Sequence, residues 1–245
     1  MMAISALAGG ISFATPAMAQ FKLGKVLGAA KDIAEAESLS DEQLKSNFSQ
    51  IAAEYDRLNP VAGPKDPYGK RIAALSKGLE KHDGLDLDIK AYLVSDINAF
   101  AMADGTIRVF AGLMDKFTDD EIRYVIGHEI GHVHAGHSRK RMQAALRASA
   151  LRKGASAAGG TAGKIADGEL GGIIQQVMVA QHSQKNENEA DEYAMGFMKG
   201  KGYDAKACVT ALDKLAELGG GGDGLPWLQT HPSPGARANR MRKLV

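Results

Sequence analysis

One five-residue segment constrains this chain more than any other: His128-Glu129-Ile130-Gly131-His132. On a helix each residue turns by about 100°, so the two histidines lie one turn apart and within about 40° of each other. Two imidazoles placed in this way can occupy adjacent corners of a tetrahedral zinc ion. Glu129 lies at the flank of the pair, where it can activate a water without being a ligand. The alternative is a surface helix with scattered histidines.

A capping box predicts where this helix begins. Thr118 is placed as the N-cap and Glu121 at the third helical position, so that each side chain can accept a hydrogen bond from the other's backbone. We expect the helix to run from about Asp119 to at least His137, and up to Leu151. Its apolar stripe lies beside the histidines and places them at the border between core and cleft; the stripe consists of Ile122, Val125, Ile126, Ile130 and Val133.

Two glycines within this helix predict a close neighbour. Gly127 and Gly131 each cost the helix about 1 kcal/mol relative to alanine. Glycine has no side chain to hold another segment away. We therefore expect a second helix to pack tightly against this face.

A catalytic zinc takes a third protein ligand and keeps one position open. The candidates lie in Glu187-Asn188-Glu189-Ala190-Asp191, on a helix predicted over residues 173–199. Helical register places five residues on one face: Glu187, Ala190, Asp191, Ala194 and Met198. Glu189 points nearly opposite. Glu187 is thus the predicted metal ligand, and Asp191 is predicted to accept a hydrogen bond from a ligand histidine. The alternative is an acidic, solvated helix face.

Two further histidines follow the motif. His134 and His137 lie off the metal-binding face or further along the chain. We expect them to be exposed to solvent or to donate hydrogen bonds from behind the ligands, and we expect no chemical role for His134.

The N-terminus resembles a secretory signal. Residues 2–19 carry no charge and end in Ala17-Met18-Ala19, a small-x-small cleavage pattern before Gln20. No Lys or Arg precedes the apolar part, and a disordered cytoplasmic N-terminus is the alternative. The predicted mature protein begins at Gln20 in the periplasm, without a cysteine for a lipid anchor. The lone Cys208 excludes a disulfide framework and is expected to be buried in a helix.

The remaining chain shows a mixed pattern. Helices are predicted over residues 41–58, 68–81 and 204–218, and loops over residues 153–172 and 219–224. The alternation between residues 89 and 110, with Asp104-Gly105 inside it, predicts two strands joined by a turn. The predicted division is a signal peptide at 1–19, an N-terminal helical segment at 20–67 and a metallopeptidase domain at 68–245.

These motifs together resemble one family. The zinc-binding helix, the segment from Glu187 to Asp191 and three further motifs are similar to the HtpX and CAAX-prenyl-protease family of gluzincin metallopeptidases, and most of all to its soluble periplasmic LoiP-like branch. The further motifs are Asn98-Ala99-Phe100-Ala101, Gly112-Leu113-Met114 and Thr230-His231-Pro232 with Arg237 following.

The resemblance implies an α+β fold, in which a mostly helical gluzincin metallopeptidase domain carries a small β-sheet beside the zinc helix. It implies that Glu187 is the third ligand to one zinc ion per chain. It also implies that the strand Asn98, Ala99, Phe100, Ala101 pairs with an extended substrate backbone. His231 is implied to lie near the metal, where it could stabilise the oxyanion or cover the site.

Two functions compete. The first is a zinc-dependent endopeptidase that cleaves unfolded or misassembled envelope proteins, with Glu129 as the general base. The second is a chaperone-like factor that binds outer-membrane assembly components and has a gated or secondary protease site. The net charge of +1 gives no reason to expect nucleic acid as a partner. No apolar stretch predicts a stable membrane span.

Overall fold

A computed structural model describes residues 41–156, 176–177, 180–220 and 224–245. The predicted signal peptide, most of the predicted loop at 153–172 and part of that at 219–224 lie outside these ranges, and the three-part division of the chain stays a prediction. The helices are α2 (Asp41–Leu58), α3 (Pro67–Leu75), α4 (Ala111–Lys116), α5 (Asp119–His134), α6 (His137–Ser156), α8 (Gln184–Lys201), α9 (Ala207–Gly219), α10 (Pro226–Thr230) and α11 (Pro234–Met241). The strands are β1 (Lys81–His82), β2 (Leu85–Asp86), β3 (Asp88–Tyr92), β4 (Ala99–Ala101) and β5 (Thr106–Phe110).

The main sheet has three strands in the order β3-β5-β4. The predicted turn at Asp104-Gly105 joins β4 to β5, and Gly105 adopts the positive φ of +95° that favours glycine. The prediction of only two strands was wrong, because β3 is a separate strand that pairs in parallel with β5. Parallel partners are distant in sequence, so no local turn signal marks them. The α+β fold with a small sheet is confirmed.

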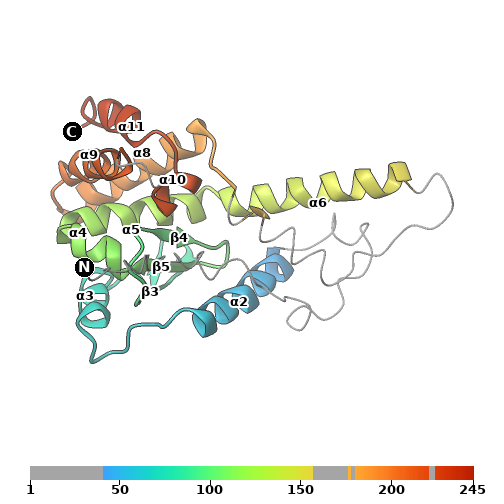
Figure 1. Ribbon diagram of the computed structural model, residues 1–245, viewed down its shortest axis with the longest axis horizontal. Coiled ribbons are helices and arrows are strands. Elements are labelled where there is room, and N and C mark those ends of the chain that lie inside the picture. Colours follow the sequence, from blue (N-terminus) through green and yellow to red (C-terminus); the bar gives the residue numbers. More distant parts are fainter. Residues whose placement is uncertain (1–40, 157–175, 178–179, 221–223) are drawn as a thin grey trace, which may run out of the picture.

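Helix α5 is the centre of the fold. It contacts β4 and β5 as well as the helices α8 and α9, and Figure 1 shows it between the sheet and these helices. Its capping box forms as predicted, with Thr118 and Glu121 exchanging hydrogen bonds. The predicted close approach is also confirmed: a Cβ on Gly131 would lie 3.0 Å from Ala190 Cα, and one on Gly127 would lie 2.7 Å from the Phe197 ring. The small face of α8 therefore packs directly on the zinc helix.

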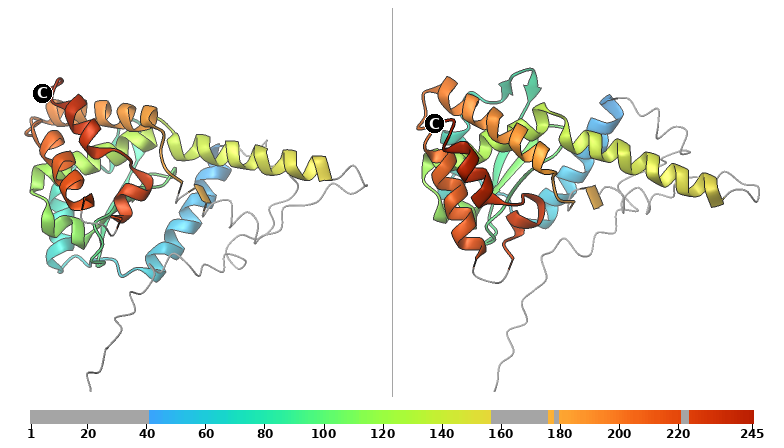
Figure 2. Two further views of the ribbon diagram at one scale, coloured as in Figure 1. Left: turned by 45° about the horizontal axis from the view of Figure 1, so that its top comes forward. Right: turned by 90° about the horizontal axis from the view of Figure 1, so that it is seen from above.

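Three helix boundaries differ from the prediction. The zinc helix does not continue through His137, because Gly136 takes a left-handed φ of +64° and ends it. The helix predicted to reach Lys81 ends at Leu75, after which β1 begins. The helix predicted from residue 173 begins at Gln184, where the Ser183 side chain accepts a hydrogen bond from a backbone N–H of the first turn. Beyond Gly136, α6 extends away from the body of the molecule (Figures 1 and 2).

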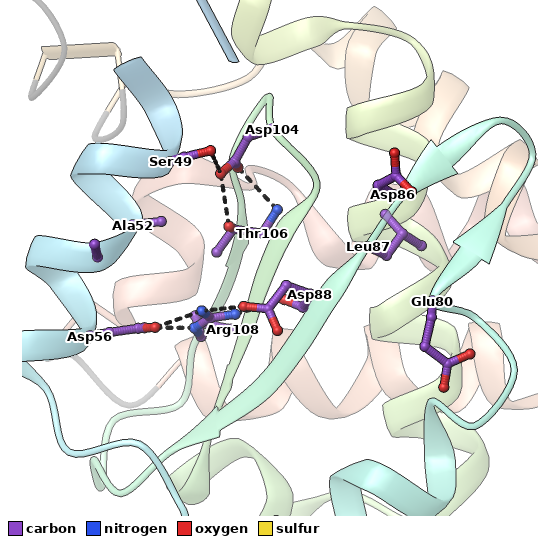
Figure 3. A pocket seen from close by; sticks show the side chains of 11 residues that line it. Ser49, Ala52, Asp56, Glu80, Asp86, Leu87, Asp88, Asp104, Thr106 and Arg108 are labelled. Carbon is purple, nitrogen blue, oxygen red and sulfur yellow. Dashed lines mark hydrogen bonds and ion pairs between the residues drawn. The ribbon is translucent and has the colours of Figure 1, made fainter. Parts of the chain in front are cut away.

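Helix α2 forms as predicted and covers the sheet on the face away from α5. It buries Phe48, Ile51 and Tyr55. Arg108 of β5 forms ion pairs with Asp56 of α2 and with Asp88 (Figure 3). Beside them lies an acidic pocket of about 520 Å³, whose residues include Ser49, Asp86, Asp104 and Thr106. Among the described residues, no helix is long and apolar enough to cross a bilayer.

Candidate metal centre

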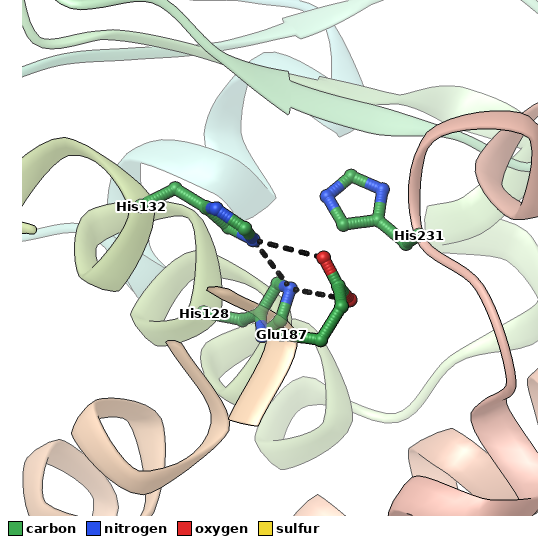
Figure 4. Close-up of side chains that lie close together, drawn as sticks. All are labelled: His128, His132, Glu187 and His231. Atoms are coloured by element: carbon green, nitrogen blue, oxygen red, sulfur yellow. Dashed lines mark hydrogen bonds and ion pairs between the residues drawn. The ribbon is translucent and has the colours of Figure 1, made fainter. Parts of the chain in front are cut away.

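Three predicted ligands meet inside the protein. His128 and His132 project from α5, and Glu187 projects from α8 (Figure 4). The Nε2 atoms of the two histidines lie 3.0 Å apart. The Glu187 carboxylate lies 3.6 Å from Nε2 of His128 and 3.4 Å from Nε2 of His132. All three side chains are at most 1 % exposed.

The chemistry of these atoms fits a cation. Asp191 Oδ1 lies 3.0 Å from Nδ1 of His128. A carboxylate accepts hydrogen bonds, so Nδ1 carries the proton and Nε2 presents a lone pair to the centre. Oε1 of Glu187 is buried there without a hydrogen-bond partner among the described residues. Lone pairs that converge in a dry site are costly unless a cation satisfies them, and this set of nitrogen and oxygen donors suits zinc.

Two carboxyl groups of the site have perturbed protonation. Burial, together with the negative charge of Glu187, raises the pKa of Glu129 to about 8. Burial likewise raises the pKa of Glu187 to about 8, against the opposing charge of Arg237. Removal from water disfavours the charged form of both groups, so each gains from a nearby cation.

Glu129 joins the metal centre to the sheet. The backbone N–H of Ala101 lies close to its carboxyl group and lowers its pKa, against the larger effect of burial. The backbone groups of Asn98 and Met102 form hydrogen bonds at the β5 side of the sheet. Because this side alternates along a strand, the backbone groups of Ala99 and Ala101 face the free side of the edge strand β4. The Asn98 side chain accepts from the Ala99 N–H at 2.9 Å. The predicted base thus lies close to the predicted substrate-binding strand, while Phe100 packs on the far face against Tyr55.

His231 lies against the same centre. Its ligand atom and those of His128, His132 and Glu187 all lie within 4.8 Å of one another. Its ring stacks on Trp227, with centroids 4.0 Å apart, and its Nε2 lies 3.5 Å from Glu129. The arrangement allows contact with either the metal or the substrate, and the predicted catalytic role stays a prediction.

A buried arginine supports the ligands from behind. Arg237 donates to both carboxylate oxygens of Asp191, at 2.9 and 2.7 Å, and forms an ion pair with Glu187. Burial opposes ionisation of Asp191, but the charge of Arg237 outweighs it and holds the pKa of Asp191 below its ordinary value. Tyr124 of α5 also donates to Asp191, at 2.7 Å. Asp191 therefore contacts the predicted ligand His128 and is held in place by two further donors.

Sequence reasoning missed three residues of the site. Arg237 is named among the sequence motifs but has no predicted role. Because the site needs a buried carboxylate, a nearby arginine could have been predicted to form an ion pair with it. His182 is buried with its ring 3.9 Å from that of His132, and Arg141 of α6 donates to it at 3.0 Å. Neither His182 nor Arg141 belongs to a local motif, so only the fold brings them to the centre.

Comparison with known proteins gives a family match. Residues 70–245 match peptidase family M48. The metalloprotease LoiP of Escherichia coli is 37 % identical over 218 residues, which cover 89 % of this chain and 86 % of LoiP. The metalloprotease YcaL of the same organism is 38 % identical over 212 residues, covering 86 % of this chain and 83 % of YcaL.

A solved structure shares the fold. The crystal structure of Ste24p from S. mikatae superposes with a TM-score of 0.51 at 18 % identity. The superposition covers 80 % of this chain and 55 % of Ste24p. The arrangement of helices around a small sheet is therefore one already known in a larger protein.

Proposed function

Because this chain belongs to peptidase family M48 and is a zinc metalloendopeptidase, we propose that it cleaves unfolded or misassembled proteins of the cell envelope in the periplasm. One observation carries the proposal: three buried candidate metal ligands lie beside Glu129, whose carboxyl group lies close to the backbone N–H of Ala101 in the edge strand β4. A protein backbone bound at that edge would pass directly over the reacting groups.

Each residue of the site would have a separate role in hydrolysis. His128, His132 and Glu187 would hold zinc, which as a Lewis acid polarises the scissile carbonyl and acidifies water. Glu129 takes a proton from the attacking water and delivers it to the leaving amine. Burial raises the pKa of Glu129 in the metal-free site, and a bound cation would favour the charged carboxylate that a general base needs.

The edge strand supports a preference for extended substrates. Strand addition needs a backbone with free N–H and C=O groups, which folded proteins rarely offer. The outward N–H groups of Ala99 and Ala101 are the positions where such a backbone would pair, after the Asn98 side chain releases the N–H of Ala99. An unfolded chain supplies the required segment, and this supports a role in removing damaged or unassembled proteins.

Glu129→Gln tests the chemistry. The variant should retain one zinc per chain and lose cleavage of casein, because the amide cannot accept the proton of water. His134→Ala is the matched control, since His134 lies exposed on the same helix and should leave both properties unchanged. Substantial casein cleavage by Glu129→Gln would overturn the mechanism. A variant that lost activity but still performed the cellular role would favour the alternative of a binding factor.

The compartment needs its own test, because the support for it comes from the uncharged residues 2–19 and the Ala17-Met18-Ala19 pattern alone. Expression of the full chain in a bacterial host should place the protein in the periplasmic extract with Gln20 at its N-terminus. Recovery of the uncleaved chain from the cytoplasm would overturn the localisation and leave the peptidase assignment intact.

A further inference from the structure

The break at Gly136 brings a second histidine behind a metal ligand. In one continuous helix His137 would point about 140° away from His132, five residues earlier. The left-handed turn at Gly136 instead lets α6 start in a new direction, and Nδ1 of His137 lies 2.9 Å from Nδ1 of His132. Both rings are buried.

The protons of this pair can be assigned from its outer partner. Glu189 Oε2 lies 3.0 Å from Nε2 of His137. A carboxylate only accepts, so Nε2 of His137 carries the proton and its Nδ1 is an acceptor. Nδ1 of His137 therefore accepts a hydrogen bond from the N–H at Nδ1 of His132, which leaves the lone pair of His132 on Nε2, facing His128 and Glu187.

We propose that His137 and Glu189 are positioning residues for the ligand His132: together they fix its tautomer and the orientation of its ring toward zinc. The inference rests on the metal centre and does not depend on the proposed substrates or compartment. It gives a role to Glu189, which points away from the zinc and reaches the centre only through His137.

The other ligand histidine has a simpler arrangement. Asp191 contacts Nδ1 of His128 directly, at 3.0 Å. Helix α8 thus supplies the ligand Glu187 and one orienting carboxylate for each ligand histidine. Asp191 orients His128 from the same face as Glu187, and Glu189 orients His132 through His137 from the opposite face. Orienting carboxylates behind histidine ligands raise metal affinity by holding the ring in place.

A second metal ion is the competing explanation. His132, His137 and His182 are close enough to share one. However, Arg141 donates to Nε2 of His182 at 3.0 Å, and its positive charge opposes a cation there. His132 would also have to lose its Nδ1 proton while it binds zinc through Nε2. The hydrogen bonds from His132 to His137 and from His137 to Glu189, called the relay below, explain the same distances. They require neither a cation beside Arg141 nor the loss of the His132 proton.

Equilibrium zinc affinity, measured by competition with a chromophoric chelator, tests the relay. His137→Phe fills the space but cannot accept a hydrogen bond, and should weaken zinc binding about 10- to 100-fold. His137→Asn places a carbonyl oxygen near the position of Nδ1, and should restore affinity to within about fivefold of the wild type. Glu189→Ala should have a smaller effect of about three- to tenfold, because this carboxylate is 43 % exposed and acts through His137.

The controls separate positioning from folding. His134→Phe changes an exposed histidine of the same region and should leave zinc affinity within about twofold of the wild type. Equal weakening by the Phe and Asn variants of His137 would overturn the relay, because packing alone would then explain the loss. A Phe variant within threefold of the wild type would overturn it as well. Two zinc ions per wild-type chain, one of them lost in His137→Phe, would establish the second metal site instead.

Discussion

The buried arginine behind the ligands allows a quantitative test. Arg237→Met keeps an unbranched side chain of similar length but removes the positive charge. In the wild type that charge faces the carboxylates of Asp191 and Glu187, and all three side chains are 0 % exposed. The variant leaves the buried carboxylate of Asp191 without its counter-charge, and Glu187, whose pKa burial raises to about 8, without its ion-pair partner.

The expected cost follows from this burial. Removal of one partner from a buried ion pair typically costs about 3–5 kcal/mol. For a chain of this size each kcal/mol lowers the melting temperature by about 2–4 °C, so the zinc-free variant should melt about 6–20 °C below the wild type. Zinc supplies Glu187 with another cation, and the loss should therefore be smaller in the zinc-loaded protein. By linkage, added zinc should raise the melting temperature of the variant more than that of the wild type.

Urea unfolding of the zinc-free proteins at neutral pH measures the free energy directly. The control is the double variant Arg237→Met with Asp191→Asn, which removes one of the stranded charges. Its destabilisation should be smaller than the sum of the two single variants by about 1.5 kcal/mol or more, because the two residues are in contact.

Two results would refute this reasoning. One is an Arg237→Met variant whose free energy of unfolding falls by less than about 1 kcal/mol, the range of an exposed ion pair. The other is strict additivity in the double variant, which would mean that Asp191 and Arg237 stabilise the fold independently.

Three further predictions concern the frame of the site. Gly131→Val should lower the free energy of unfolding by about 1–3 kcal/mol, because its Cβ would lie 3.0 Å from the α8 backbone. Gly196→Ala is the control: a Cβ there would meet no neighbouring segment of the described residues within 4 Å, so thermal stability should be equal or higher. Thr118→Ala removes the cap of α5 and should cost about 1 kcal/mol in urea unfolding, whereas no loss would show that the cap is dispensable. Burial raises the pKa of Asp56, but hydrogen bonds from its arginine and tyrosine partners outweigh this and hold that pKa below its ordinary value. The stability that ionised Asp56 contributes is thus present above about pH 4 and is lost as the pH falls through its lower pKa in the folded state. The difference in unfolding free energy between wild type and Asp56→Asn should therefore narrow between pH 6 and pH 3. An unchanged difference would contradict the ion pair.

Local chemistry made the zinc helix predictable. The capping box at Thr118 and the glycines at 127 and 131 act within a few residues, so the sequence alone indicates both the start of α5 and the close contact with α8. Helical register also placed Glu187 and Asp191 on the packed face, where the structure has them. The roles assigned to these residues rest on the geometry and await the tests above.

The misses share a physical cause. Gly136 adopts a left-handed φ, unlike Gly127 and Gly131, and the residue type is the same at all three positions. Strand β3 pairs with a partner that lies beyond β4 in sequence, so its pairing carries no local signal. Glu189 was correctly placed away from the metal, yet it reaches His132 through a histidine that only the helix break brings into range.

The burial of the candidate metal ligands has a kinetic consequence. Zinc held by side chains that are at most 1 % exposed should be released to a chelator mainly when the surrounding elements open. The rate of metal loss should then reach a plateau as chelator concentration rises, and the plateau equals the rate of opening. Time courses of zinc release would therefore measure how often the protein exposes its catalytic centre, which is a separate quantity from how tightly it binds the metal.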